Sequence, residues 1–201
     1  RTRNAARSWM TKSELRKLYL EKRRDLSPVE HAGFSSKIGE LLFSNFDLSP
    51  IATVHCFISS KHTGEVETSG IFERYWREFP QIKTVAPRVN EQTGEIDALP
   101  FGPDTRLVEN KWKISEPADG NAVEPNEIDL VLVPLLCFDM RGYRVGYGKG
   151  FYDKFLAKCR PDCLKIGLSF FPPVERINDI HDGDVPLDFC VTANGLILFK
   201  K

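Results

Sequence analysis

Residues 128–138 (IDLVLVPLLCF) are very apolar, and they run directly into a segment with four glycines and three cations, residues 141–153 (RGYRVGYGKGFYD). The apolar run predicts the most deeply buried strand of the chain. Glycine allows positive φ and lets the backbone approach another body closely, at an entropic cost. A buried strand, a glycine loop and a following helix are typical of an α/β fold whose loop faces a ligand. The cations indicate that this ligand is an anion.

The composition makes any affinity for anions local. The chain has 201 residues, 41% of them apolar and 28% charged, which is typical of a globular protein that buries a core. Lys plus Arg, at 28, equals Asp plus Glu, so no global field recruits nucleic acid or an anionic membrane. We expect residues 11–201 to form one catalytic domain and residues 1–10 to be an N-terminal extension or an expression remnant.

Neither a membrane span, a secretory signal nor a zinc motif is expected. No run of ~18 apolar residues could span a bilayer, and RTRNAARSWM lacks the apolar region of a secretory signal. Three of the five cysteines lie in apolar runs, as buried thiols do in a reducing compartment. The pair in CRPDC has no second pair and no nearby histidine, which argues against zinc. The sequence therefore predicts a cytoplasmic protein.

Helix and strand signals alternate along the chain. Thr11 with Glu14, and Ser27 with Glu30, form capping boxes that start two helices, the second with Pro28 at its first position. The predicted helices end near 25, 43, 79 and 159; the predicted strands are 51–58, 83–89, 95–101, 128–138, 164–170 and 188–199, the last broken by a tight turn at 194–195. Residues 102–127 are predicted to be a long loop or crossover. This alternation predicts a three-layer α/β fold, a mainly parallel, mixed sheet flanked by helices.

The glycine loop fits neither of two common phosphate-binding patterns. The P-loop pattern G-x4-G-K-[ST] fails at Tyr143 and Gly150, and the Rossmann pattern G-x-G-x-x-G fails at Phe151. A glycine turn that opens a helix is nevertheless an anion site, because free N–H groups and the helix dipole face the ligand. An irregular turn without a ligand remains the alternative, although such a turn has no need of Arg144 and Lys149.

Residues 134–153 resemble the signature of the 5-formyltetrahydrofolate cyclo-ligases, also called 5,10-methenyltetrahydrofolate synthetases: roughly P-G-x-x-F-D-x-x-G-x-R-L-G-x-G-x-G-Y-Y-D. The similarity extends to Lys12-x-x-Leu15-Arg16, Glu65-Val-Glu67-Thr68, Trp112-Lys-Ile-Ser-Glu116-Pro117 and Val-Pro-Leu-Asp188, and so covers nearly everything from residue 11 onward. The chain departs from the family at Leu135, where glycine is frequent, at Phe151, where tyrosine is usual, and in a slightly long loop at 59–65.

The resemblance implies a reaction. Cyclo-ligases convert 5-formyltetrahydrofolate and ATP into 5,10-methenyltetrahydrofolate, ADP and phosphate. Phosphorylation turns the formyl oxygen into a leaving group, N10 attacks the carbon, and phosphate departs as the ring closes. Such a protein must position two substrates and neutralise charge, and needs no nucleophile of its own. The absence of a Ser-His-Asp pattern agrees with this expectation.

The resemblance also implies site residues. Lys149 and Arg144 would be catalytic. The expected ATP site consists of Lys12, Arg16, Arg144, Gly146, Tyr147, Gly148, Lys149, Gly150, Phe151 and Tyr152. The expected folate site consists of Phe57, Ile58, Glu65, Trp112, Tyr147, Gly148, Lys149, Gly150 and Phe151. The expected ligands of Mg²⁺, the implied cofactor, are Asp153 and Asp188.

Each of these residues also has an ordinary structural interpretation. Lys12 and Arg16 lie one helical turn apart, which by itself fits a solvated basic face. Asp153 could complement a helix dipole, and Asp188 could end a strand. Phe57 and Trp112 could be plain packing residues, like Ile58, and Glu65 could face solvent.

Two other functions remain open from the sequence alone: another small-molecule phosphotransferase that uses the same loop, and a non-catalytic nucleotide- or RNA-binding module. The zero net charge speaks against RNA. The expected partners are ATP and 5-formyltetrahydrofolate, free or polyglutamylated, with no nucleic acid and no membrane, and the protein is expected to be a monomer.

Overall fold

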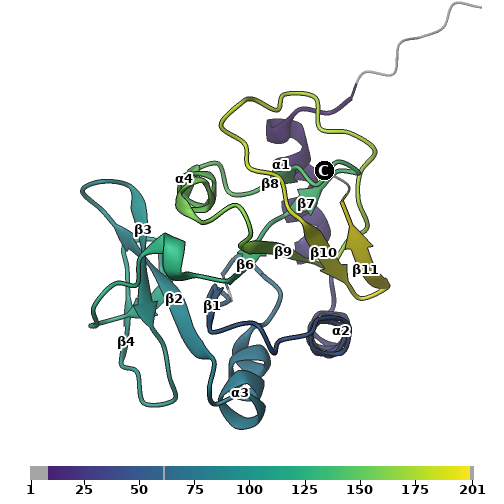
Figure 1. Ribbon diagram of the computed structural model, residues 1–201. Coiled ribbons are helices and arrows are strands. Elements are labelled where there is room, and N and C mark those ends of the chain that lie inside the picture. Colours follow the sequence, from purple (N-terminus) through teal and green to yellow (C-terminus); the bar gives the residue numbers. More distant parts are fainter. Residues whose placement is uncertain (1–8, 61, 200–201) are drawn as a thin grey trace, which may run out of the picture.

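A computed structural model of the protein describes residues 9–60 and 62–199. It contains a seven-stranded sheet of order β11-β10-β9-β6-β1-β2-β3, flanked by helices (Figure 1). The five strands from β10 to β2 are parallel, and the edge strands β11 and β3 are antiparallel to their neighbours. The predicted mainly parallel, mixed sheet is therefore confirmed. Residues 1–8 of the expected N-terminal extension lie outside the described residues.

The main elements follow the predicted order. The helices are α1 (Lys12–Arg24), α2 (Pro28–Asn45), α3 (Ser69–Glu78) and α4 (Phe151–Lys158). The strands of the large sheet are β1 (Thr53–Cys56), β2 (Lys83–Asn90), β3 (Glu95–Pro100), β6 (Leu130–Pro134), β9 (Leu164–Ser169), β10 (Phe189–Thr192) and β11 (Gly195–Leu198). Both predicted capping boxes form, with Thr11 and Ser27 as the N-cap residues of α1 and α2. The expected turn at 194–195 joins β10 to β11.

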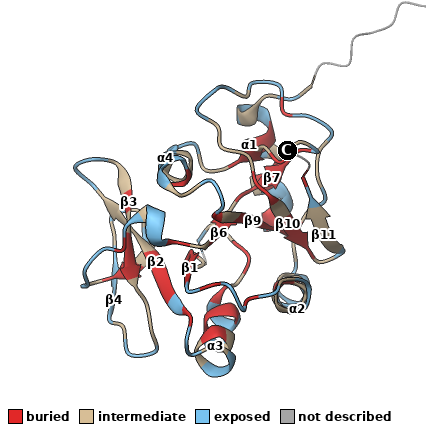
Figure 2. Cartoon of the chain, viewed as in Figure 1, coloured by how far each residue is buried: buried red, intermediate tan, exposed pale blue. Residues whose placement is uncertain are grey.

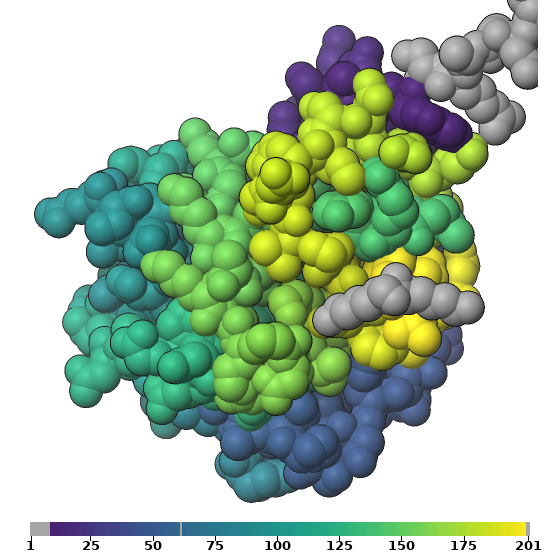
Figure 3. Space-filling view, turned by 45° about the horizontal axis from the view of Figure 1, so that its top comes forward, coloured from purple at the N-terminus to yellow at the C-terminus, as the bar shows by residue number. Residues whose placement is uncertain are grey.

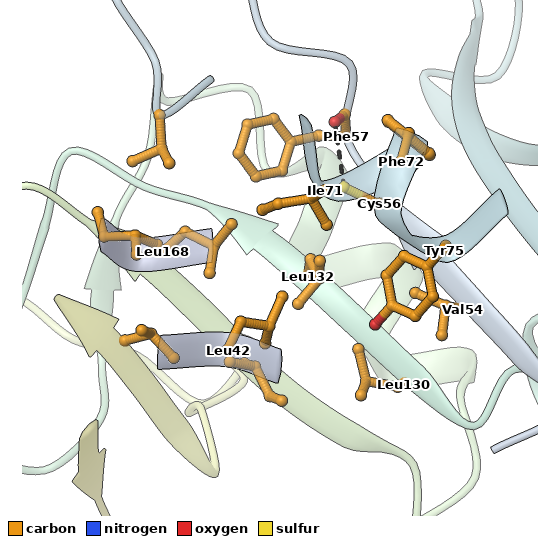
Figure 4. Close-up of a cluster of buried hydrophobic side chains, with 14 of the residues drawn as sticks. Leu42, Val54, Cys56, Phe57, Ile71, Phe72, Tyr75, Leu130, Leu132 and Leu168 are labelled. Carbon is orange, nitrogen blue, oxygen red and sulfur yellow. Dashed lines mark hydrogen bonds between the residues drawn. The ribbon is translucent and has the colours of Figure 1, made fainter. Parts of the chain in front are cut away.

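The central strand β6 divides the core into two layers by simple alternation. Leu130 and Leu132 face the layer that contains α2 and α3 (Figure 4), and Val131 and Val133 face the layer that contains α4. All four are completely buried, as is most of the centre of the sheet (Figure 2). Full burial of such a side chain contributes ~1.5–3 kcal/mol, so this strand anchors both layers.

The prediction of one continuous strand over 128–138 is wrong. β6 ends at Pro134, and the chain turns away to form β7 (Cys137–Phe138), which pairs antiparallel with β8 (Arg144–Val145) in a separate hairpin. The run stays apolar because Leu135 and Leu136 are buried in different clusters on either side of this turn. Hydrophobicity alone cannot reveal a buried change of direction. The glycine segment predicted at 141–153 accordingly begins within a hairpin.

Residues 102–127 are also more ordered than predicted. They contain the antiparallel pair β4 (Leu107–Glu109) and β5 (Ser115–Pro117), followed by the 3-10 helix η1 (Pro125–Glu127). The side chain of Asn110 holds the turn between the strands by accepting hydrogen bonds from the N–H groups of Trp112 and Ile114, 2.9 and 3.1 Å away. Three-residue strands are too short to show a periodicity. Among the residues that the structure describes, no helix combines the length and apolar character needed to cross a membrane.

A matched pair of glycine substitutions tests the β7–β8 hairpin. Gly142 lies in its turn with φ +85°, and an added Cβ would lie 2.9 Å from both the Leu187 carbonyl oxygen and Phe199 Cγ. Gly142→Ala should therefore lower the free energy of unfolding by about 1–3 kcal/mol. Gly33→Ala, at an exposed position inside α2 where no described side chain lies within 4 Å of the new carbon, should raise it by ~0.5–1 kcal/mol. Urea denaturation measures both values; equal stabilities for the two variants would contradict the hairpin geometry.

Candidate active site

Helix α1 packs against the β7–β8 hairpin and the glycine loop that follows it. Arg16 Nε donates a hydrogen bond to the carbonyl oxygen of Gly146 over 2.9 Å. Gly148 has φ +89°, and a Cβ there would lie 3.2 Å from the Arg16 guanidinium carbon. Glycine is required at this position for its backbone conformation as well as for its size. Arg16 is therefore part of the loop structure, which the spacing of charges on the helix did not show.

The first turn of α1 is held by a segment from the other end of the chain. Asn178 N–H donates to the Met10 carbonyl over 3.0 Å, Lys12 N–H donates to Asp179 Oδ1 over 2.6 Å, and the Lys12 ammonium pairs with Asp184. Figure 3 shows this segment lying against the N-terminal helix. Burial opposes ionisation of Asp184, but the hydrogen bond from Lys12 holds the pKa of this carboxyl below its usual value. Asp184 is not among the site residues predicted from the sequence.

Arg144 and Asp153 form an ion pair at the start of α4. Arg144 Nη2 donates to Asp153 Oδ1 over 2.8 Å, and Nη1 donates to the Val185 carbonyl over 2.5 Å. The Arg144 side chain is 5% exposed and the Asp153 side chain 29%. Burial lowers the pKa of Arg144 and the Asp153 carboxylate opposes that effect, so the guanidinium stays charged. Arg144 is thus a fixed, buried cation beside the start of α4.

The loop ends at Gly150, which caps α4 with φ +70°. No described side chain caps this helix terminus, so its first amide groups are available to an anion. Lys149 is exposed between Gly148 and Gly150. The predicted ATP residues from Arg144 to Gly150, together with Lys12 and Arg16, therefore gather around one helix N-terminus. The role of each of them stays a prediction.

Glu65 lies on the other side of Tyr147. The Glu65 carboxylate is buried and accepts a hydrogen bond from Ser60 N–H over 2.8 Å. Burial raises the pKa of Glu65, whereas the Ser60 N–H, the positive charge of Arg23 and the Tyr147 hydroxyl act to lower it. Arg23, which is not among the residues predicted from the sequence, is buried and donates to Tyr147 Oη over 2.6 Å.

Four aromatic residues predicted for the substrate sites, together with Ile58, lie in three separate regions of the structure. The rings of Trp112 and Phe151 lie 5.9 Å apart, so the β4–β5 turn meets the start of α4. Phe57 is 4% exposed within the core cluster shown in Figure 4, and half-buried Ile58 packs against that cluster. Tyr152 points its hydroxyl into the interior, where the oxygen has no hydrogen-bond partner among the described residues.

Asp188 and Asp153 contact different residues. It precedes β10 at the amino end of the parallel strands, where its Oδ2 accepts a hydrogen bond from Lys165 N–H over 2.8 Å and lies 3.8 Å from the Lys165 ammonium. It lines a shallow cavity of about 280 Å³ beside residues 161–164, which precede β9. Asp153, in the first turn of α4, is instead bonded to Arg144 and Val185.

The two expected magnesium ligands therefore have different protein partners, and their role as a pair stays a prediction. Within residues 9–60 and 62–199, no three His, Cys, Asp or Glu side chains group as metal ligands. Mg²⁺ is commonly held by one or two carboxylates together with substrate phosphates, and Asp153 fits that pattern beside the loop. Asp188 fits a structural role, because its hydrogen bond ties β10 to β9.

Comparison with known proteins gives a consistent result. The model of the 5-formyltetrahydrofolate cyclo-ligase family matches residues 9–192. The 5-formyltetrahydrofolate cyclo-ligase of Mycoplasma pneumoniae is 32% identical over 162 residues, which cover 80% of this chain and 86% of that protein. The cyclo-ligase of Escherichia coli K12 is 28% identical over 182 residues, 87% of this chain and 96% of that protein.

Two solved structures are similar along nearly the whole chain. The 5,10-methenyltetrahydrofolate synthetase of Aquifex aeolicus has a TM-score of 0.81 at 31% identity, over 96% of this chain and 94% of that one. The M. pneumoniae synthetase has a TM-score of 0.72 at 30% identity, over 92% and 99% of the two chains. With the glycine loop, the α1 cations and the buried glutamate in one place, and with a family match across residues 9–192, the chain belongs to the 5-formyltetrahydrofolate cyclo-ligase family.

Proposed function

We propose that this protein catalyses the ATP-dependent cyclisation of 5-formyltetrahydrofolate to 5,10-methenyltetrahydrofolate, with release of ADP and phosphate. The observation that carries this proposal is the meeting of Arg16, Arg144 and Glu65 around one glycine loop at the start of α4. The two cations suit a polyphosphate, and the buried carboxylate suits a nitrogen-rich ring. The family membership supplies the reaction that joins these two ligands.

The phosphate side of the site acts by charge and position. The amides at the start of α4 and the side chains of Arg16, Arg144 and Lys149 would hold the triphosphate, so that its terminal phosphoryl group points at the formyl oxygen. Phosphoryl transfer through a loose transition state needs such alignment and neutralisation rather than a protein nucleophile. Arg144 is already fixed by Asp153 and Val185, so little reorganisation is needed when negative charge develops.

The folate side acts by orientation. Glu65 would accept hydrogen bonds from the pterin ring, with Tyr147 beside it and with Ile58 and the Trp112–Phe151 pair as apolar walls. Once the formyl oxygen carries the phosphoryl group, N10 attacks the carbon and phosphate leaves. Holding N10 within reach converts this step into an effectively intramolecular one.

Asp153 would hold Mg²⁺ together with the phosphate oxygens. When bound, the ion supplies positive charge to those oxygens. Asp153 also fixes Arg144, so this one carboxylate would link the metal to the protein cation.

The direct test mixes the protein with Mg-ATP and 5-formyltetrahydrofolate and follows the near-ultraviolet absorbance of the methenyl product. We expect absorbance to rise only when both substrates are present. Calorimetric ATP binding without any methenyl formation would instead favour a different small-molecule phosphotransferase.

The first substitution concerns Lys149. If its ammonium contacts phosphate, Lys149→Ala should weaken ATP binding or slow turnover at least ~10-fold, because a hydrogen bond to an ion contributes ~1.5–3 kcal/mol. The melting temperature should stay the same, since the side chain is exposed. Lys154→Ala, an exposed lysine on the following helix turn, is the control. Unchanged kinetics in the Lys149 variant would make it a surface charge only.

The second pair of substitutions separates metal binding from structure. Asp153→Asn removes the charge proposed to face Mg²⁺ and should raise the Mg²⁺ concentration needed for half-maximal activity. Asp188→Asn alters a buried contact with Lys165, so it should lower stability and leave the Mg²⁺ requirement as it was. Mg²⁺ titrations at saturating ATP, beside melting curves, distinguish the two. A raised Mg²⁺ requirement in the Asp188 variant would place Asp188 in the metal site after all.

We further propose that residues 11–201 act as one catalytic domain in a cytoplasmic monomer that accepts free and polyglutamylated folates. The strongly exposed large apolar side chains among the described residues include Val29, Met140 and Leu198, on separate elements. Scattered apolar residues of this kind do not form an interface patch.

A further inference from the structure

Arg23 is a buried cation that the proposed chemistry does not yet use. It lies near the end of α1, is 6% exposed, and donates from Nη1 to Tyr147 Oη over 2.6 Å and to the Thr63 carbonyl over 3.3 Å. Its Nη2 donates to the Leu135 carbonyl. The adjacent Arg24 is exposed, because it points to a different face of α1 from the buried Leu15, Tyr19 and Arg23.

A purely structural role does not explain why a charged side chain is buried at position 23. Burying a guanidinium carries a desolvation penalty of several kcal/mol, and an apolar side chain of similar size often stabilises a fold as well or better. The three hydrogen-bond acceptors of Arg23 are neutral, and its Nε has no partner among the described residues. The nearby carboxylate on which Arg23 acts is that of buried Glu65, whose pKa the positive charge of Arg23 lowers.

Tyr147 connects Arg23 to Glu65. Burial, with the Glu65 carboxylate nearby, raises the pKa of Tyr147 to about 12, so the hydroxyl keeps its proton at neutral pH. Because the Tyr147 oxygen accepts a hydrogen bond from Arg23, its own proton points away from the guanidinium. The same hydroxyl lies close enough to the Glu65 carboxylate to lower its pKa, and Arg23 also donates to the carbonyl of Thr63, two residues before Glu65.

We propose that Arg23 is a positioning residue for the folate substrate: it orients the Tyr147 hydroxyl, which in turn holds the Glu65 carboxylate ready to accept hydrogen bonds from the pterin ring. This inference rests on the proposed function. The residues of α1 would then have two different roles: Lys12 and Arg16 act on the phosphate side of the site, and Arg23 acts on the folate side. Arg23 itself need not touch either substrate.

The charged and polar groups around Glu65 give a pH test. Ser60 and Thr63 face it from its own loop, Arg23 from α1 and Tyr147 from the glycine loop, and Tyr152 of α4 senses its charge. Burial raises the pKa of Glu65, and Arg23 opposes that rise. Activity that needs the carboxylate is present above its pKa and lost as pH falls through it. Removal of Arg23 should therefore move the acid limb of the profile to higher pH.

The experiment compares Arg23→Met with Arg24→Met, its exposed neighbour, by measuring kcat/KM for 5-formyltetrahydrofolate across pH and KM for ATP. For Arg23→Met we expect the acid limb to move up by about one pH unit or more, since a nearby opposite charge shifts a carboxyl pKa by ~1–3 units. That shift corresponds to a ~10-fold loss on the acid side. KM for ATP should change less than ~2-fold, since no hydrogen bond that Arg23 makes among the described residues goes to Lys12, Arg16, Arg144 or Lys149. Arg24→Met should match the unchanged protein.

Tyr147→Phe provides the second test, and it decides the matter if Arg23→Met fails to fold. It removes one oxygen and keeps the ring, and it should move the acid limb in the same direction. An acid limb that stays in place in both variants, or an equal loss of affinity for ATP and folate, would reduce Arg23 to a structural residue. If the unchanged protein yields no methenyl product, the proposed function falls and this inference falls with it.

Discussion

The arrangement of the site depends on one buried carboxylate. Asp139 is completely buried, and its two oxygens accept five hydrogen bonds: from Arg141 N–H, Nε and Nη2, from Tyr143 N–H and from Ile177 N–H. These bonds close the turn of the β7–β8 hairpin and attach it to the segment that later contacts α1. The hairpin also contains Arg144, which lies beside Asp153 at the start of α4. A carboxylate satisfied so fully is a rigid support, and the cations of the site are placed relative to it.

The site also explains how a protein without net charge can bind a polyanion. Its cations are concentrated where elements distant in sequence meet: α1 crosses the glycine loop through Arg16, and the C-terminal segment returns to pair with Lys12 through Asp184. Ion pairs with Asp153 and Asp184 hold Arg144 and Lys12 in place. Each of these cations still has N–H donors outside its ion pair. Charge at the site is therefore local, fixed and directed at one helix terminus.

Much of this could be predicted from the sequence, and the failures have physical causes. Capping boxes at Thr11 and Ser27 fix two helix starts because they are local hydrogen-bond patterns. The turn after Pro134 could not be predicted, since the residues on both sides of it are apolar and buried. Arg23 could have been distinguished from Arg24, because it follows Leu15 and Tyr19 at four-residue spacing on the buried face of α1. Its hydrogen-bond partners, and the contact of Asp188 with Lys165, could not be predicted, because they lie on other elements.

The anion site at the start of α4 is proposed to bind the triphosphate of ATP. A crystal structure of the protein with Mg²⁺ and a non-hydrolysable ATP analogue measures this directly. We expect phosphate oxygens within hydrogen-bond distance of the Arg16 and Arg144 guanidinium groups and of the loop amides, with the metal on Asp153. Phosphates bound elsewhere, for example in the cavity beside Asp188 at the amino end of the sheet, would contradict it.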